Sequence, residues 1–364
     1  MTRLTEQIAE RIVAEHSFDT GPTGFVGATV ELLPVALEPV DPPAGPVFER
    51  LWHGYLTGDH TGVLAVSTPM SPGLDVAVRH LAADLAVARR VLADYGLAPS
   101  ERAIDTHRPP DDPEFLRTRT SMENDADAFR MRTGAVRVCL DAGDAGLGLR
   151  RRWEVARAVG PVLTAAFANS PLRHGRPTGW RSTRQALRLG IDTPLPPGDP
   201  RTAWTRYALD HPVAGTELSF RQALRDGCPL DNDDLWQHLD TLPSPLRARG
   251  LLELSMIDAQ PGDGWRVALA VTTALIDDDR ADDEALAATA DLPADAWTRS
   301  ARDALADPLI ADATRRCFLA AYAALARQGA DRHIRDDVAK YLERYVNRNR
   351  TPADDLLDAL RTPT

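Results

Sequence analysis

The sequence predicts an α+β fold, and three features lead to that prediction. Segments that alternate like β-strands are separated by helical segments, without the regular strand–helix–strand rhythm of a parallel sheet. From about residue 281 the apolar spacing is that of consecutive helices. The chain has 364 residues, 43% of them apolar, which is enough for one large domain with a real core. We therefore expect one domain over 1–364, with the sheet in 1–280 and a helical part in 281–364.

The N-terminal half predicts short strands and two long helices. Residues 1–16 and 74–95 carry apolar residues at spacings of three and four, which is typical of amphipathic helices. Gly96 suits the position just after the second helix. β-branched and alternating residues predict strands at 25–33, 62–67 and 134–141.

The second half becomes increasingly helical. We expect a long helix at about 150–168, and an irregular segment at 170–203, which is rich in Gly, Pro, Arg and Thr. A loop of that length inside a domain is usually functional or disordered. The remaining expected elements are a strand at 250–258, a strand or helix at 266–276, and helices at about 282–289, 294–305, 308–328 and 334–347.

Composition excludes several classes of function. The net charge is −11 and no basic cluster could follow a phosphate backbone, so we expect no nucleic-acid partner. No apolar run of about 18 residues predicts a membrane span. The three cysteines, Cys139, Cys228 and Cys317, lie far apart, as in a protein of the reduced cytoplasm. Without a CxxC or HExxH motif, a zinc site is not expected.

Three predicted strands each carry polar residues on one side. Side chains two apart on a strand share a face. The polar residues are Thr29 and Glu31 in the first strand, Arg137, Cys139 and Asp141 in the second, and Glu253 and Ser255 in the third. If the strands pair in one sheet, that side is a polar floor for a ligand. A solvent-facing sheet is the alternative, with equal weight from spacing alone.

Five segments, in order over about 20–357, resemble blocks of the glutamate–cysteine ligases of the ergothioneine type, a carboxylate–amine ligase family. They are VGATVELL (26–33), TGAVRVCLDAG (133–143), AAFANSPLRHGRPTGWRSTRQALRLGIDTPLPP (165–197), LRARGLLELSMIDAQPGDGW (246–265) and RYVNRNRTPADDLL (344–357). The resemblance implies a glutamine-synthetase-like ligase fold. In that fold a curved, mostly antiparallel sheet forms a cradle, and helices pack outside it.

The resemblance also implies an activity. ATP would phosphorylate the side-chain carboxylate of glutamate, and the amine of cysteine would attack the acyl phosphate. The product, γ-glutamylcysteine, would serve ergothioneine biosynthesis in the cytoplasm of an actinobacterium. The implied cofactors are ATP and Mg²⁺, and the implied partners are the small molecules glutamate, cysteine and ATP, with no nucleic acid and no membrane.

Site residues carry over from the resemblance position by position. Glu31, Glu253 and Arg249 are the implied catalytic residues, and Glu31 and Glu253 are also the implied metal ligands. The implied substrate- or nucleotide-binding residues are Arg137, Asn169, Arg176, Arg184, His238, Arg247 and Arg348. For Arg247 and Arg249 the alternative is surface pairing with acids such as Asp240.

Several positions depart from the family pattern. Thr29 and Ala65 stand where the family has glutamates, and Asp59 replaces a third acid only loosely. Arg137 stands in place of a glutamine, Cys139 in place of an asparagine, and Ser255 in place of an arginine. Losing acids and gaining a cation weakens Mg²⁺ binding, and Arg137 could fill the space of a metal by pairing with Glu31 or Glu253. The alternatives are a member with a changed substrate, or a non-catalytic binding or regulatory relative.

Overall fold

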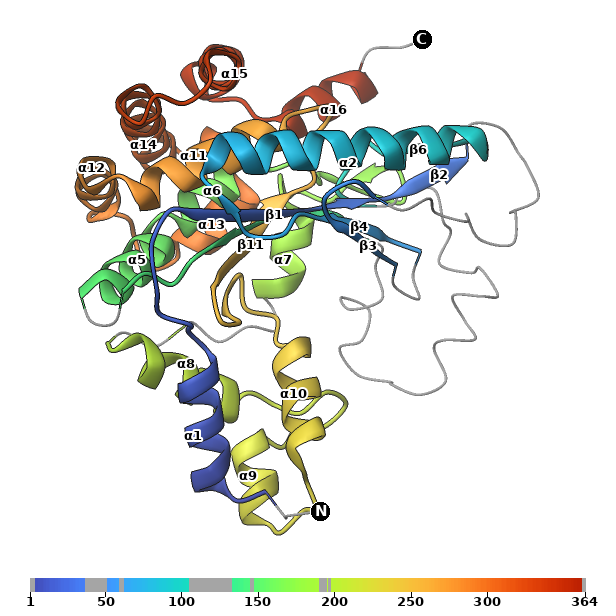
Figure 1. Ribbon diagram of the computed structural model, residues 1–364. Helices are drawn as coiled ribbons and strands as arrows, with labels where there is room; N and C mark the ends of the chain where they lie inside the picture. The colour runs from blue at the N-terminus through green and yellow to red at the C-terminus, as the bar shows by residue number, and fades with distance from the viewer. Residues whose placement is uncertain are drawn as a thin grey trace.

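A computed structural model describes residues 4–36, 51–58, 62–104, 133–144, 147–189, 195 and 198–361. It has the predicted α+β architecture (Figure 1). Seven strands form one sheet in the order β10–β11–β7–β1–β4–β3, with β5 beside one end of β1, and all these pairs are antiparallel. Its strands are β1 (Phe25–Leu32), β3 (Tyr55–Gly58), β4 (Leu64–Ser67), β5 (Ser71–Pro72), β7 (Ala135–Leu140), β10 (Leu246–Ala248) and β11 (Leu252–Asp258).

Two small ribbons lie outside this sheet. They are β2 (Pro34–Ala36) with β6 (Leu97–Pro99), and β8 (Leu172–Arg173) with β9 (Arg176–Pro177). The α-helices are α1 (Glu6–His16), α2 (Leu74–Asp94), α5 (Leu147–Ala158), α6 (Gly160–Ala166), α7 (Thr183–Leu189), α8 (Pro200–Asp210), α9 (Phe220–Arg225), α10 (Asn232–Thr241), α11 (Trp265–Asp277), α12 (Asp279–Thr289), α13 (Ala296–Arg302), α14 (Pro308–Arg327), α15 (Arg332–Arg344) and α16 (Pro352–Arg361). Two 3₁₀ turns, Ala304–Ala306 and Val346–Arg348, join the last helices.

Local sequence explains where several helices begin and end. Thr5 and Asp307 cap α1 and α14 through their side-chain oxygens, and Pro308 occupies the first position of α14, where its missing N–H costs nothing. Asp231 caps α10 in a reciprocal capping box with Asp234. Gly96 follows α2 with φ of +68°, which confirms the prediction that a glycine ends this helix.

Two predictions of secondary structure were wrong. The helix expected at 150–168 is divided into α5 and α6 around Val159, because Pro161 cannot donate to the preceding turn. The segment 170–203 is not irregular in its described part, since it contains the β8–β9 hairpin, α7 and the start of α8. Residues 266–276, left open between strand and helix, are helical in α11. Asp59 lies outside the described residues.

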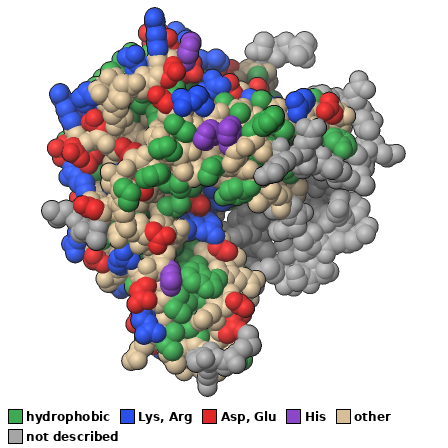
Figure 2. Space-filling view, in the orientation of Figure 1, with side chains coloured by type: hydrophobic (Ala, Val, Ile, Leu, Met, Phe, Trp, Pro, Cys, Tyr) green, Lys and Arg blue, Asp and Glu red, His purple; other side chains and the backbone are tan. Residues whose placement is uncertain are grey.

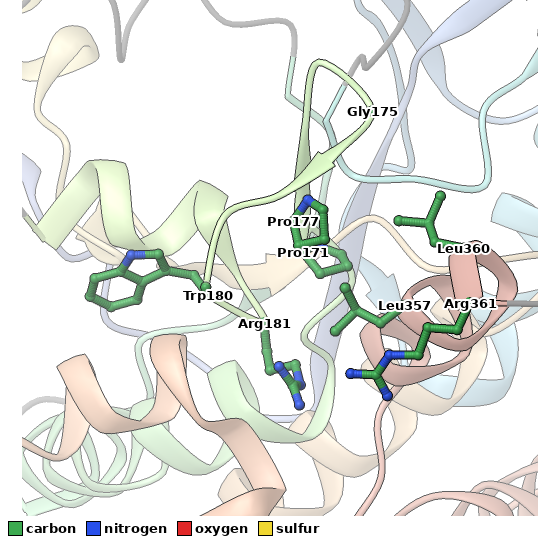
Figure 3. Close-up of a pocket in the computed structure, with 9 residues that line it drawn as sticks. Pro171, Gly175, Pro177, Trp180, Arg181, Leu357, Leu360 and Arg361 are labelled. Carbon is green, nitrogen blue, oxygen red and sulfur yellow. The ribbon is translucent and has the colours of Figure 1, made fainter.

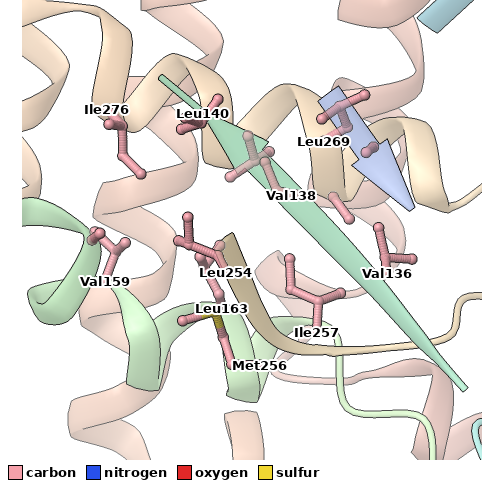
Figure 4. Packing of buried hydrophobic residues seen from close by; sticks show 14 of the residues in the cluster. Val136, Val138, Leu140, Val159, Leu163, Leu254, Met256, Ile257, Leu269 and Ile276 are labelled. Atoms are coloured by element: carbon pink, nitrogen blue, oxygen red, sulfur yellow. The ribbon is translucent and has the colours of Figure 1, made fainter. Parts of the chain in front are cut away.

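One face of the sheet forms the hydrophobic core. Val136, Val138 and Leu140 of β7 alternate onto this face and are fully buried. Leu254 and Ile257 of β11 extend the same layer. Figure 4 shows these residues packed between α11, which contributes Leu269 and Ile276, and α6 with its preceding residue, which contribute Leu163 and Val159. The apolar side chains of these strands therefore pack against helices, and their polar side chains project from the opposite face of the sheet.

The helices divide into two groups around the sheet. Figure 1 shows α2, α11, α14 and α15 above it, and α1, α8, α9 and α10 below it. Arg221 of α9 bonds Glu6 of α1 and Asp210 of α8, and so ties the lower group together. Within the described part of the chain, no helix combines the length and the apolarity that crossing a bilayer requires.

Candidate active site on the polar face of the sheet

The strand register brings the polar residues onto one face. Thr29 of β1 lies opposite Arg137 of β7, and Cys139 of β7 lies opposite Glu253 of β11. Arg247 of β10 lies opposite Glu253 in turn. Since directly paired residues project to the same side, these strands form one continuous polar surface, as the alternation predicted. We call it the polar floor; it consists of Thr29, Glu31, Arg137, Cys139, Arg247, Glu253 and Ser255.

Both acids of the polar floor are paired with arginines. Arg137 forms an ion pair with Glu31, one of the two partners that the sequence predicted for it. Arg247 Nη1 lies 3.4 Å from Glu253 Oε1. Both glutamates are 8% exposed, so the polar floor is not an open, solvent-facing sheet. Figure 2 shows basic and acidic side chains meeting in a hollow between the upper body and the lower helices.

Electrostatics keep these groups charged. Burial alone would raise the pKa of Glu253, but the guanidinium groups of Arg247 and Arg137 outweigh it and lower that pKa below its usual range. Burial would likewise lower the pKa of Arg137, but Glu31 and Glu253 raise it. Burial raises the pKa of the Cys139 thiol to about 12, so this side chain is neutral at physiological pH. The polar floor thus contains both positive and negative side chains, and most of them have little contact with water, so their electrostatic interactions are strong.

A bulge in β11 shapes one side of the polar floor. The register between β11 and β7 shifts between Leu254 and Ile257, which frees backbone carbonyls from the ladder. Arg184 and Gln185 of α7 take up the Ser255 carbonyl at 2.6 and 3.4 Å, and Gln185 also donates to the Met256 carbonyl at 2.9 Å. The bulge therefore anchors α7 against the sheet.

Arg188 is a site residue that the sequence reasoning missed. It lies one helical turn after Arg184, so both side chains leave α7 on the same side. Its Nη1 donates to Ser255 Oγ at 2.9 Å, and no described carboxylate lies within ion-pair distance of it. Burial, then the charges of Arg184 and Arg137, lower the pKa of Arg188. The i, i+4 spacing of the two arginines was the signal available in the sequence.

Asn169 and Arg184 have structural partners. The Asn169 side chain donates to the carbonyls of Glu101 and Ala259, at 2.8 and 2.7 Å. Arg184 pairs with Asp258 at 3.4 Å, and both side chains are almost completely buried. These two residues therefore tie the segment after α6 and helix α7 to β11 and the residue that follows it.

The remaining predicted site residues are distributed more widely. Arg249 adjoins the polar floor and pairs with exposed Asp240 on α10, the alternative that the sequence left open. His238 is buried within the lower helices, where its Nε2 lies 2.7 Å from the Ala208 carbonyl. Arg176 is exposed on the β8–β9 hairpin, and Arg348 lies in the last 3₁₀ turn. The structure therefore brings Glu31, Arg137, Arg247, Arg249 and Glu253 together and leaves His238, Arg176 and Arg348 apart from them.

A separate cavity lies between the β8–β9 hairpin and α16. It has a volume of about 520 Å³, and Figure 3 shows Leu357, Leu360 and Arg361 of α16 facing Pro171 and Pro177 across it. No residue of the polar floor lines this cavity. Its lining combines apolar residues with Arg181 and Arg361 and, among the described residues, includes no carboxylate.

The described residues do not fit the Mg²⁺ site that the resemblance implies. They contain no group of three His, Cys, Asp or Glu residues placed to hold a metal ion. Glu31 and Glu253 are each engaged by an arginine. Across β1 and β4, Glu31 faces Ala65, which has no oxygen to offer. A hard divalent cation prefers several oxygen ligands, and here it would also meet two guanidinium groups.

Comparison with known proteins shows consistent similarities. The profile of the family described as glutamate-cysteine ligase family 2 (GCS2) matches residues 56–363. "Glutamate--cysteine ligase EgtA" of Mycobacterium tuberculosis H37Rv is 31% identical over 96% of this chain and 89% of its own. The protein of the same name from Mycolicibacterium smegmatis is 31% identical over 97% and 91%. A chloroplastic glutamate–cysteine ligase of Arabidopsis thaliana is 28% identical over 58% of this chain and 42% of its own.

A solved structure supports the fold. The bifunctional glutathione synthetase of Pasteurella multocida superposes with a TM-score of 0.56 at 14% identity. The match covers 97% of this chain and 51% of that one, so the chain spans about half the length of the bifunctional enzyme.

Proposed function

Since the chain belongs to glutamate-cysteine ligase family 2, a family of enzymes, we propose that it joins the side-chain carboxylate of glutamate to the amine of cysteine with consumption of ATP. Family membership implies small-molecule substrates and suggests, in general, the use of ATP and a divalent metal. The product would be γ-glutamylcysteine, used as a sulfur donor for ergothioneine.

The proposed reaction has two steps. A γ-carboxylate oxygen of glutamate attacks the terminal phosphorus of ATP, the bond to ADP breaks, and an acyl phosphate forms. The amine nitrogen of cysteine then attacks the carbonyl carbon, phosphate leaves, and the amine loses a proton. Both steps move negative charge between oxygens, so they need fixed cations close to the reacting groups.

The polar floor is the observation that carries this proposal. Arg247 and Arg137 are positioned by Glu253 and Glu31, and an arginine fork suits a carboxylate or a phosphate. Glu253 Oε1 is buried and has no hydrogen-bond partner among the described residues, so it can accept an N–H of the cysteine amine. In this scheme Glu253 is catalytic, and Arg249 contacts substrate at the entrance. Glu31 is a positioning residue that acts through Arg137.

One observation favours a second candidate. Arg137 interacts with both acids and is bonded to Glu31, so a guanidinium stands where the resemblance placed a metal. That arrangement suits a relative that binds an anionic amino acid or nucleotide without turnover. Its chemistry would then be limited to recognition.

An assay of product formation separates the two candidates. The chain is incubated with glutamate, cysteine, ATP and Mg²⁺, and released phosphate and γ-glutamylcysteine are measured together. Glu31→Ala serves as the site variant. Arg316→Leu serves as a matched loss of an arginine, because Arg316 is exposed on α14, far along the chain from the polar floor. We expect wild type and Arg316→Leu to form product and Glu31→Ala to lose most of the activity.

Wild-type protein that releases no phosphate above the Glu31→Ala background would refute the ligase reaction. Calorimetric binding of glutamate or ATP in the same preparation would then establish the binding role. Folded protein that binds neither ligand would exclude both candidates.

A further inference from the structure

Arg188 is the most unusual charge near the polar floor. Its single hydrogen bond to a described residue goes to Ser255 Oγ, at 2.9 Å. Ser255 in turn donates to the carbonyls of Ser244 and Pro245, so this hydroxyl is already held by the backbone. Arg188 is partly buried, so its guanidinium has lost water, and no carboxylate in the described part of the chain supplies a counter-charge. An anionic ligand would supply that counter-charge.

The charge balance around Arg188 points the same way. Among the residues that the structure describes, the cations within electrostatic reach of one another are Arg137, Arg184, Arg188 and Arg247, and the acids are Glu31, Glu253 and Asp258. Four cations and three anions leave an excess of one positive charge. Arg249 and Asp240 cancel each other, and the neutral Cys139 thiol adds nothing. The chain as a whole carries −11, so this local excess runs against its overall charge.

Two arginines of the polar floor also have buried donors without partners in the described part of the chain. Arg137 Nε and Arg247 Nε are buried and lack a hydrogen-bond partner among the described residues. Arg247 is itself only 7% exposed. Buried donors of this kind are normally satisfied, and the oxygens of an anionic ligand or an ordered water would satisfy them here. Together with Arg188 they offer guanidinium N–H groups from two strands and one helix.

We propose that the polar floor binds an oxyanion, a phosphate group of a nucleotide, directly through Arg188 with Arg137 and Arg247, with no divalent cation as a bridge. This proposal rests on the proposed function and specifies how its site neutralises the nucleotide. Arg137, held by Glu31 and in reach of Glu253, takes the place of the ion. Guanidinium forks are suited to this work because they present paired donors to two oxygens at once.

Calorimetry on the full chain tests the proposal, with ATP and with inorganic tripolyphosphate as probes, in excess EDTA and in excess Mg²⁺. We expect both probes to bind in EDTA, with a Kd within about threefold of that in Mg²⁺. Arg188→Leu should raise the Kd in EDTA by about tenfold or more, since a hydrogen bond to a charged group is lost. Arg316→Leu, the matched control, should leave it unchanged. Thermal unfolding checks each variant, and Arg188→Lys, which keeps the charge, should show a smaller rise.

The outcomes separate this inference from the ligase proposal. Binding that requires Mg²⁺ would overturn the inference, while product formation in Mg²⁺ would leave the ligase proposal intact. Binding in EDTA without any γ-glutamylcysteine would support the inference and refute the ligase reaction. Folded Arg188→Leu that binds like wild type, or a wild type that binds neither probe in either buffer, would also overturn it.

Discussion

Replacing Asp258 with asparagine should destabilise the whole protein. Its carboxylate is 1% exposed and accepts four hydrogen bonds. Oδ2 receives the Asn169 N–H at 2.9 Å and the Ser170 hydroxyl at 2.7 Å. Oδ1 receives the Ser182 hydroxyl at 3.0 Å and an Arg184 N–H at 3.4 Å. All the partners are donors, so the new amide group would place two further donors against them.

The size of the effect follows from the burial of Arg184. Its guanidinium is 1% exposed, and Asp258 is the carboxylate paired with it. Removing one partner of such a pair costs about 3–5 kcal/mol, because the other charge stays buried without compensation. With a urea dependence of roughly 3 kcal/mol per M, the unfolding midpoint of Asp258→Asn should fall by at least about 1 M.

Urea unfolding followed by tryptophan fluorescence measures this change, and Glu284→Gln provides the matched control. Glu284 forms an exposed i, i+4 pair with Arg280, and losing it should cost less than about 0.5 kcal/mol. The double variant Asp258→Asn with Arg184→Met should recover part of the loss, because no buried cation is then left unpaired. An Asp258→Asn protein within about 1 kcal/mol of wild type, or no more affected than Glu284→Gln, would refute this reasoning.

Three further predictions concern other parts of the molecule. Burial, with the nearby His238, lowers the pKa of His211 to about 4. In the unfolded chain a histidine binds a proton near pH 6.5, so the free energy of unfolding should fall as the pH drops from about 6.5 to 4. Urea titrations at pH 7 and pH 5 should show this fall in the wild type and a smaller one in His211→Gln. A Cβ at Gly160 would lie 2.3 Å from the Trp297 ring, so Gly160→Ala should lose about 1–3 kcal/mol of unfolding free energy, and unchanged thermal stability would contradict this packing. Arg249→Leu should lower kcat/KM about tenfold with no change in the urea midpoint, while Asp240→Asn, which breaks the same exposed pair but keeps the cation, should retain activity; equal losses in both variants would remove Arg249 from the site.

Part of the sheet could be predicted because β7 alternates between apolar and polar residues. Val136, Val138 and Leu140 alternate with polar residues, and that period of two identifies both the core face and the polar floor. The sequence also predicted that Arg137 pairs with Glu31 or Glu253, and the structure shows the pair with Glu31. The alternation of residues along a strand was sufficient to predict its two faces, because in a regular strand the direction of each side chain depends only on its position in the strand.

The structural partners of Asn169 and Arg184 could not be predicted, because they depend on contacts between distant segments. Asn169 and Arg184 had polar side chains in a Gly- and Pro-rich segment, which is typical of a binding loop. Their partners Asp258, Ala259 and Ser255 lie about 70 to 90 positions later in the chain, and no spacing rule connects them. Polar residues that stabilise a site and polar residues that touch a ligand therefore look alike until the chain is folded.

Arg188 shows why this distinction matters for function. Its position depends on the bulge in β11, because the freed Ser255 and Met256 carbonyls hold α7 through Arg184 and Gln185. Arg184 thus forms a buried ion pair that stabilises the fold. Arg188, one turn later, is bonded to a neutral hydroxyl, so its charge is available to bind a ligand. Helix α7 therefore carries one arginine that is paired with Asp258 and, one turn later, a second that has no carboxylate partner among the described residues and lies beside the polar floor. Any substitution that loosens the first arginine, Asp258→Asn included, should therefore also displace the second, so stability and anion affinity should decline together.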